Sequence, residues 1–441
     1  MCSHLATITK KVNEKTMEPR NIFMLIVLSG VLIVFSSLIL PEPKINDSTE
    51  YIQLSKNLLH NNLHYAGATN ADKDFRLFSK RTLGFPLFIA FQKTTTALFV
   101  AQLLLYLLLV MLGFKVLNFL STKQTSAWFY LLFVLFSPLI LFHVVFILSD
   151  LMLAVVVLIA AVIGLEKNVK PKHKLNLIFT LWAVALLIKP VILPSIFLIP
   201  LVVLFIKHRL RIWSFASILP FMVWFMVSAE NYYNTGVYEY SSISTINLAH
   251  YNAKLTIASK YGNDSAQQFT ESKIYSIPTN SATYREYLNN LNAAAKNAIL
   301  QNIPTYIKIQ LLGMVKMVID PGRWELYTYF KQNTADGSLT ELLFARKWNE
   351  LNSKMQANQA LFYTFLFLLT TNLLKIIGII FSFFKPNKYW FMLLAICAYF
   401  TVITGPIGAA RFMLPAAILS IVLSVYGWTV ALDFFQKRSK R

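Results

Sequence analysis

Residues 22–40 read IFMLIVLSGVLIVFSSLIL, a run that contains no charged side chain. An α-helix needs about 20 apolar residues to cross a hydrocarbon core about 30 Å thick. Similar runs recur along the chain, and 56% of its 441 residues are hydrophobic. Only 14% are charged, whereas a soluble domain carries about 25%. The sequence therefore predicts an all-α polytopic membrane protein.

Ten transmembrane spans fit the apolar runs of this chain. They cover residues 21–40, 96–119, 127–147, 150–165, 174–188, 190–206, 212–228, 360–384, 389–404 and 412–432. This arrangement divides the chain into three regions. They are an N-terminal transmembrane module in residues 1–228, which includes a first outer loop at 41–95, an outer loop region at 229–359, and C-terminal transmembrane helices in 360–441.

The basic residues indicate which side of the membrane each loop faces. Much of the net charge of +21 sits in short loops between the apolar runs. Short basic loops are typical of the cytoplasmic side, where they face anionic lipid, and this placement argues against nucleic acid as a partner. We therefore expect both termini to be cytoplasmic and the first span to remain uncleaved. Cys2 and Cys397 should lie far apart, which predicts no disulfide and favours a bacterial inner (plasma) membrane.

Two tight turns on the outer side follow from this topology. Lysines lie at both ends of residues 174–206, so both ends should face the cytoplasm, and the segment is too long for one crossing as a single helix. We expect the chain to turn at Lys189-Pro190, because proline favours a break in a helix. A second outer turn is expected near Ser149-Asp150.

The outer loop region is predicted to be mainly helical. Apolar positions recur at helical spacing in Ser281–Asn302. Ile303–Ile319 is apolar but short and interrupted by lysines, so we expect it to lie at the membrane interface. A polar helix is expected over Ser338–Met355.

Charged residues from distant parts of the chain fall on the outer side in this topology. The stretch Asn46-Asp47-Ser48-Thr49-Glu50-Tyr51 follows the first span and supplies two acids. The other outer charges are Lys80, Arg81, Asp150, Lys189, Glu230 and Arg411. Ionisable groups beside a membrane are costly unless they are paired, hydrated or used. The set is therefore a candidate functional site.

Each of these residues also has a structural interpretation. Asp47 with Glu50 fits the N-cap of a helix that runs to His60. Arg81 could be an interfacial anchor, and Arg411 could form an ion pair with a nearby acid. Asp150 fits a cap, Lys189 could extend to the interface, and Glu230 fits a structural role.

Five short motifs together resemble a known family. They are Asp47-Ser48-Thr49-Glu50-Tyr51, Arg81-Thr82-Leu83-Gly84-Phe85-Pro86, Ser149-Asp150, Leu187-Ile188-Lys189-Pro190 and Ala410-Arg411-Phe412-Met413-Leu414-Pro415. Their order and shared side resemble the GT-C superfamily of polytopic glycosyltransferases, and within it the branch of protein O-mannosyltransferases and lipid A aminoarabinose transferases. The chain departs from the family pattern at Ser48, where relatives often have a second acid, and at Leu83, which replaces a proline.

The resemblance implies a GT-C-like helical bundle and an inverting sugar transfer. The donor would be a sugar on polyprenyl phosphate, and the acceptor an extracytoplasmic hydroxyl on a glycolipid, polysaccharide or protein. Asp47 would be the catalytic base, and Arg81, Lys189 and Arg411 would bind the donor phosphate. Glu50, Tyr51 and Asp150 would support them. We expect no cofactor, and the serine at position 48 argues against a metal.

Two other classes of membrane protein fit part of the same pattern. A flippase or transporter for lipid-linked sugars predicts helices broken by Gly and Pro and charges near the middle of the membrane. A polymerase or ligase of lipid-linked sugars predicts Arg and His in the large outer loop. His250 is the only histidine in residues 229–359, so this signal is weak.

Overall fold

The computed structural model describes residues 19–39, 45–61, 64–69, 72–121, 123–210, 214–330, 346–350, 353 and 359–438. Every regular element in these residues is helical, apart from an isolated bridge between Tyr65 and Phe78. The all-α prediction is confirmed. Most of the helix expected over Ser338–Met355 lies outside the described residues, as does Cys2.

The apolar part of the molecule consists of helices and short helical turns in chain order. They are α2 (Pro19–Ile39), α5 (Thr95–Leu120), α6 (Gln124–Leu135), α7 (Pro138–Leu141), η2 (Phe142–Val144), α8 (Asp150–Leu165), α9 (Pro171–Ile188), η3 (Pro190–Leu198), α10 (Ile199–Leu210), η4 (Phe215–Ile218), α11 (Leu219–Thr235), α20 (Gln359–Ser382), α21 (Lys388–Ile403), η7 (Gly405–Ile407), η8 (Ala410–Met413) and α22 (Leu414–Arg438). The helices break at both expected positions, since α9 ends before Lys189 and α8 begins at Asp150. The location of these breaks on the outer side remains a prediction.

Three helices among the described residues are long and apolar enough to cross a membrane. They are Thr95–Leu120, Gln359–Ser382 and Ala410–Arg438. A fourth span is possible if Thr125–Leu135 and Pro138–Val144, which are bent by 66°, count as one broken span. The prediction of ten spans is therefore not confirmed.

Helix length and proline account for four of the predicted spans that are missing from this set. Asp150–Leu165 and Lys388–Ile403 are apolar but have only 16 residues each, or about 24 Å at 1.5 Å per residue. The run at 127–147 breaks before Pro138, and the run at 190–206 begins as a 3₁₀ segment that contains Pro194. Proline removes a backbone donor and disfavours a continuous α-helix.

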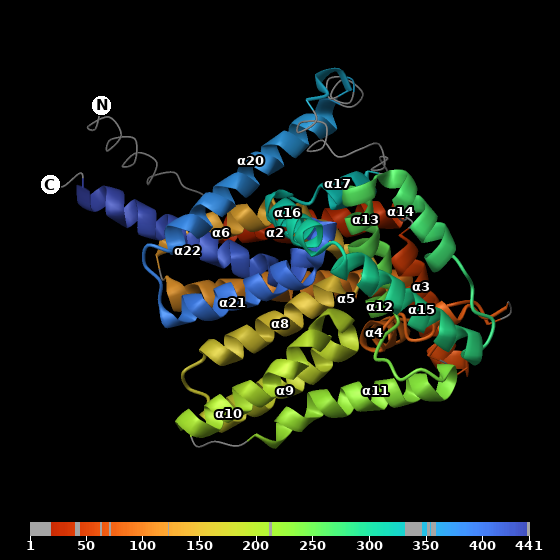
Figure 1. Ribbon diagram of the computed structural model, residues 1–441. Coiled ribbons are helices and arrows are strands. Elements are labelled where there is room, and N and C mark those ends of the chain that lie inside the picture. The colour runs from red at the N-terminus through yellow and green to blue at the C-terminus, as the bar shows by residue number, and fades with distance from the viewer. Residues whose placement is uncertain are drawn as a thin grey trace.

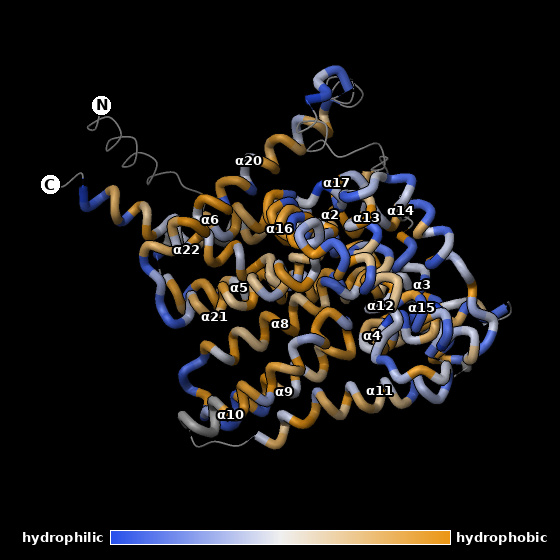
Figure 2. The backbone as a smooth tube through the Cα atoms, viewed as in Figure 1, coloured by the Kyte–Doolittle hydropathy of each residue, from blue (hydrophilic) through white to orange (hydrophobic). Residues whose placement is uncertain are grey.

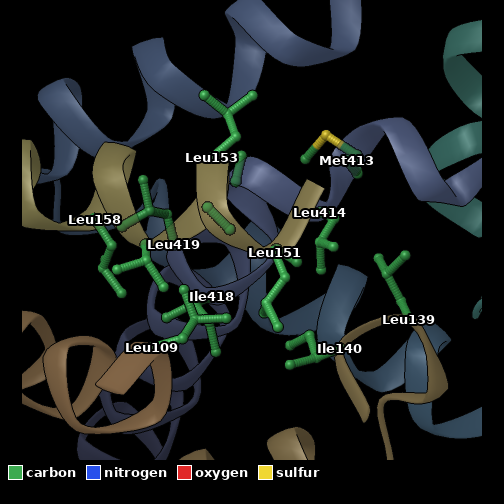
Figure 3. Packing of buried hydrophobic residues seen from close by; sticks show 14 of the residues in the cluster. Leu109, Leu139, Ile140, Leu151, Leu153, Leu158, Met413, Leu414, Ile418 and Leu419 are labelled. Carbon is green, nitrogen blue, oxygen red and sulfur yellow. The ribbon is translucent and has the colours of Figure 1, made fainter. Parts of the chain in front are cut away.

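Helix α22 is the centre of the apolar part. It packs against α5, α6, α8, α20 and α21, and its residues from Leu414 to Leu419 are all buried. Figure 3 shows Ile418 beside Leu109 of α5 and Leu419 beside Leu158 of α8. The crossing of α22 with α20 is especially close, because a Cβ added at Gly427 would lie 1.8 Å from the carbonyl oxygen of Gly378.

The remaining helices form a second part of the molecule, and most of them are polar. They are α3 (Asn46–Asn61), η1 (Phe75–Leu77), α4 (Gly84–Ala90), α12 (Ile243–Asn247), the π-helical η5 (Leu248–Ala253), α13 (Lys254–Tyr261), α14 (Asn263–Phe269), the π-helical η6 (Thr270–Ile274), α15 (Ser281–Leu300), α16 (Ile303–Ile319) and α17 (Arg323–Tyr329). Among them, α4 and α16 are apolar. Helix α16 has the predicted bounds and α15 ends two residues earlier than predicted; the interfacial position of α16 remains a prediction.

Helices of this second part gather at one end of the molecule. In Figure 1, α3, α4, α14 and α15 lie at the right, whereas α10, the loop between α8 and α9, and the end of α22 lie at the left. Figure 2 shows hydrophobic residues predominating in α5, α8 and α9 between these two ends. The architecture is therefore an apolar helical body with a polar helical cap.

Candidate functional site

The first two turns of α3 supply three residues of the predicted site. Glu50 and Tyr51 lie three and four residues after Asp47, so both share a face of the helix with it. Helix α3 begins at Asn46, so Asp47 lies inside its first turn rather than at the N-cap. The oxygens of Asp47 accept hydrogen bonds from arginine side chains, as described next. Asp47 therefore does not act as the helix cap.

Two guanidinium groups bind the two oxygens of Asp47. Arg81 donates from Nη2 to Oδ1 over 2.6 Å, and Arg411 donates from Nη2 to Oδ2 over 2.7 Å. Arg81 also donates from Nε to Oε2 of Glu50 over 2.7 Å, and Lys80 donates to the other Glu50 oxygen over 2.6 Å. The two acids of α3 are thus held by three cations from two distant segments.

A second pair of charges lies beside the first. Lys189, the residue between α9 and η3, donates a hydrogen bond of 2.5 Å to Oδ1 of Asp150. The Nε of Arg411 lies 3.5 Å from Oδ2 of the same aspartate. Tyr51 links the two groups, because its hydroxyl is 2.9 Å from Oγ of Ser149. The structure therefore brings together all seven residues of the predicted site.

Glycines allow the segments that carry these residues to approach closely. A Cβ added at Gly84, the first residue of α4, would lie 2.8 Å from the carbonyl oxygen of Leu187. This contact sets the chain that follows Arg81 against the end of α9. A Cβ at Gly313 of α16 would likewise lie 2.7 Å from Cα of Pro406, in the turn before η8. Both contacts help to fix the segments that carry the cations.

Aromatic rings lie beneath the cations of the site. The Arg81 guanidinium lies 5.1 Å from the centroid of the Tyr51 ring, and that of Arg411 lies 5.5 Å from the Trp324 ring. Lys189 lies 5.7 Å from the ring of Phe412. Cations within about 6 Å of a ring face are attracted by the ring quadrupole. The rings therefore help to hold the cations in one geometry.

These groups line a cavity of about 700 Å³. Ligand pockets in proteins commonly have volumes of about 300–1,000 Å³. Its charged walls are formed by Asp47, Lys80, Arg81, Lys189 and Arg411. Other walls come from α12, η5 and α17, with Ser244, Asn247, Tyr251, Asn252, Trp324 and Thr328, and from apolar residues such as Ile45, Val191, Leu193 and Ile407. The cavity is therefore lined by cationic, polar and apolar side chains together.

The electrostatics of the cavity favour an anionic ligand. Four cations, Lys80, Arg81, Lys189 and Arg411, face the three carboxylates of Asp47, Glu50 and Asp150. Burial raises the pKa of Asp47, but the guanidiniums of Arg81 and Arg411 outweigh burial and lower it to about 2. Asp47 is therefore ionised at neutral pH, and the group retains one excess positive charge.

One further acid near the site was not predicted from the sequence. Glu325 of α17 is fully buried, and burial, followed by the nearby charge of Asp320, raises its pKa to about 8. Its neighbour Trp324 lines the cavity and contacts Arg411. The surrounding sequence, Gly322-Arg323-Trp324-Glu325, carries no spacing that would have linked it to the distant acids.

Glu230 lies apart from this group. Its carboxylate is 3.5 Å from Nδ1 of the buried His64, and it does not line the cavity. This position agrees with the structural interpretation of Glu230. Among the described residues, no three His, Cys, Asp or Glu side chains are grouped as metal ligands.

No family model, curated protein or solved structure matches this chain. The fold and site themselves define the class: an all-helical protein with helices of membrane-crossing length and an ion-paired cavity beside its polar cap. The resemblance to polytopic glycosyltransferases therefore stands as a hypothesis about function.

Proposed function

We propose that this chain is a multi-pass membrane glycosyltransferase that moves a sugar from polyprenyl phosphate to an extracytoplasmic hydroxyl, with inversion. The observation that carries the proposal is the pairing of a carboxylate, Asp47, with the two guanidiniums of Arg81 and Arg411 at the wall of a cavity of about 700 Å³. Guanidiniums match the geometry of phosphate oxygens. A carboxylate beside them can accept the proton of an attacking hydroxyl.

The proposed reaction is a single displacement at the anomeric carbon. The acceptor hydroxyl gives its proton to Asp47 while its oxygen forms a bond to the anomeric carbon. The bond between that carbon and the phosphate oxygen breaks, and its electron pair stays on the phosphate. Arg81, Arg411 and Lys189 stabilise the charge that develops there, an effect worth about 3–4 kcal/mol for one preorganised donor.

The other residues of the site have positioning roles in this proposal. Glu50 holds Arg81 and Lys80 through its two oxygens, and Asp150 holds Lys189. The Tyr51 hydroxyl contacts Ser149, and its ring lies under Arg81. These contacts keep the cations aimed at the cavity before a donor arrives. The partly apolar walls of the cavity are suited to the isoprenoid next to the phosphate.

The experiment that tests the proposal uses purified protein in liposomes with a polyprenyl-phosphate sugar labelled in the sugar. Membrane lipids, polysaccharide and protein fractions serve as acceptors. Transfer of label from the donor to one acceptor supports a glycosyltransferase. Label that crosses the bilayer still attached to the donor supports a flippase instead, and label that accumulates in repeat-unit polymers supports a polymerase. Either of the last two results contradicts the proposal.

A further inference from the structure

Asp47 is the carboxylate of the cavity wall that binds both Arg81 and Arg411. Both of its oxygens accept hydrogen bonds from guanidinium nitrogens, at 2.6 and 2.7 Å. A carboxylate and a phosphate present similar pairs of acceptor oxygens to arginine. A phosphate that enters the cavity therefore competes with Asp47 for Arg81 and Arg411.

The three carboxylates of the site differ in how easily they can yield a cation. The side chain of Asp47 is 27% exposed, that of Glu50 is 17% exposed, and that of Asp150 is fully buried. Asp47 is also the only one of the three that lines the cavity. An entering anion thus meets Asp47 first. Glu50 keeps its contacts with Lys80 and with Nε of Arg81, and Asp150 keeps its contact with Lys189.

We propose that Asp47 is a resident anion that holds Arg81 and Arg411 in place until a phosphate group displaces it, and that this displacement frees the carboxylate to act as a base. The inference rests on the proposed function, in which the phosphate belongs to the lipid-linked donor. It makes the base dependent on the substrate, because Asp47 is available only after the arginines have turned to the phosphate.

The displacement gives the reaction an order. With two guanidiniums attached, the carboxylate holds a proton weakly and is a poor base. Once the donor phosphate takes the guanidiniums, Asp47 can accept the proton of the acceptor hydroxyl. The new bond to the anomeric carbon forms, the bond to the phosphate breaks, and the leaving polyprenyl phosphate keeps the electron pair. When Asp47 then releases its proton to water, it competes again for the arginines and promotes release of the phosphate.

The test measures the affinity of a phosphate without any sugar, so that binding is separated from transfer. Polyprenyl monophosphate and inorganic phosphate are titrated against the purified full-length protein in nanodiscs. The variants are Asp47→Asn and Asp47→Ala, each checked for a wild-type melting temperature. The control is Asp433→Asn, which removes a carboxylate that pairs with Lys123 outside the cavity.

If Asp47 is displaced, its removal tightens binding of polyprenyl monophosphate by about tenfold or more, because one charge-assisted hydrogen bond to a competitor is worth roughly that factor. Asp433→Asn should leave the affinity unchanged. If the Asp47 variants bind both polyprenyl monophosphate and inorganic phosphate more tightly, the site recognises the phosphate group itself. If they bind only polyprenyl monophosphate more tightly, the site recognises the lipid-linked phosphate.

Unchanged or weaker binding in folded Asp47 variants overturns the displacement, because Asp47 would then only organise the arginines. This outcome is distinct from failure of the proposed function. Loss of transfer in Asp47→Asn with unchanged phosphate affinity leaves Asp47 as a base and removes the displacement. Absence of transfer by the wild-type protein removes the glycosyltransferase, while tighter binding of inorganic phosphate by Asp47→Asn would still support a displaceable anion.

Discussion

Arg411 donates a hydrogen bond from Nη2 to Oδ2 of Asp47 over 2.7 Å, although 364 positions separate the two residues in the chain. Arg411 also lies over the ring of Trp324 and 3.5 Å from Asp150. Arg411 therefore joins the C-terminal part of the chain to the start of α3. Its removal should affect binding and turnover of the donor together.

We predict that Arg411→Gln lowers kcat/KM for the lipid-linked donor by about 10²–10³, the usual cost of one preorganised donor to a developing anion. Arg411→Lys should recover part of this loss, because lysine keeps the charge but not the bidentate geometry. The measurement is transfer from labelled donor at several donor concentrations.

The matched control for Arg411 is Arg285→Gln. Arg285 is exposed on α15 and donates to the carbonyl oxygen of Gly236, so its replacement should leave kcat/KM unchanged. Equal losses in Arg411→Gln and Arg285→Gln would contradict a specific role for Arg411.

Glu325 makes the stability of the fold dependent on pH. A glutamate in water has a pKa of 4.5, and burial raises the pKa of Glu325 to about 8 in the folded protein. The folded state holds the proton of Glu325 more tightly than the unfolded state does. The contribution of Glu325 to the free energy of unfolding is therefore fully present below pH 4.5 and is lost as the pH rises through about 8. We predict a lower melting temperature at about pH 8.5 than at about pH 5.5, and a smaller difference in Glu325→Gln.

The control for Glu325 is Glu286→Gln, which removes an exposed acid of α15. This variant should keep the wild-type dependence of melting temperature on pH. If Glu325→Gln shows that same dependence, Glu325 does not remain protonated in the folded state at neutral pH.

Close packing of α22 on α20 gives a prediction about stability. An added Cβ at Gly427 would lie 1.8 Å from a backbone oxygen of Gly378, so the helices must separate in Gly427→Ala. Small residues allow such close helix crossings in membrane proteins, and overpacking costs about 1–3 kcal/mol. We expect a lower melting temperature in detergent.

Gly164→Ala is the matched control for Gly427→Ala. Its added Cβ would meet only the flexible end of Met392, at 3.3 Å or more. Its melting temperature should equal or exceed that of the wild-type protein, because alanine favours a helix more than glycine does. A wild-type melting temperature in Gly427→Ala would show that α20 does not pack on α22 in this way.

Much of the helical pattern could be predicted from the sequence. The bounds of α8 and α16 agree with the predicted ranges 150–165 and 303–319, because a charged or proline-containing segment marks each end. The break before Pro138 was not predicted, because apolar residues continue on both sides of it. Apolarity therefore located the helices better than it located their interruptions.

The membership of the site was predictable, but its contacts were not. The topology inferred from the basic loops placed Asp47, Arg81 and Arg411 on the same side of the membrane. Sequence spacing carries no information on which oxygen each guanidinium binds, because these contacts depend on close approaches such as that of Gly84 to Leu187. The stacking of Trp324 under Arg411 was missed for the same reason.

In the proposed reaction, Asp47 is the base in sugar transfer from polyprenyl phosphate. The most direct measurement is the single-turnover rate of transfer from labelled donor in wild-type protein and in Asp47→Asn, with both saturated by donor. We expect Asp47→Asn to lower this rate by about 10²–10⁴ and Asp433→Asn to keep the wild-type rate. Transfer by Asp47→Asn at the wild-type rate would contradict the role of Asp47 as the base.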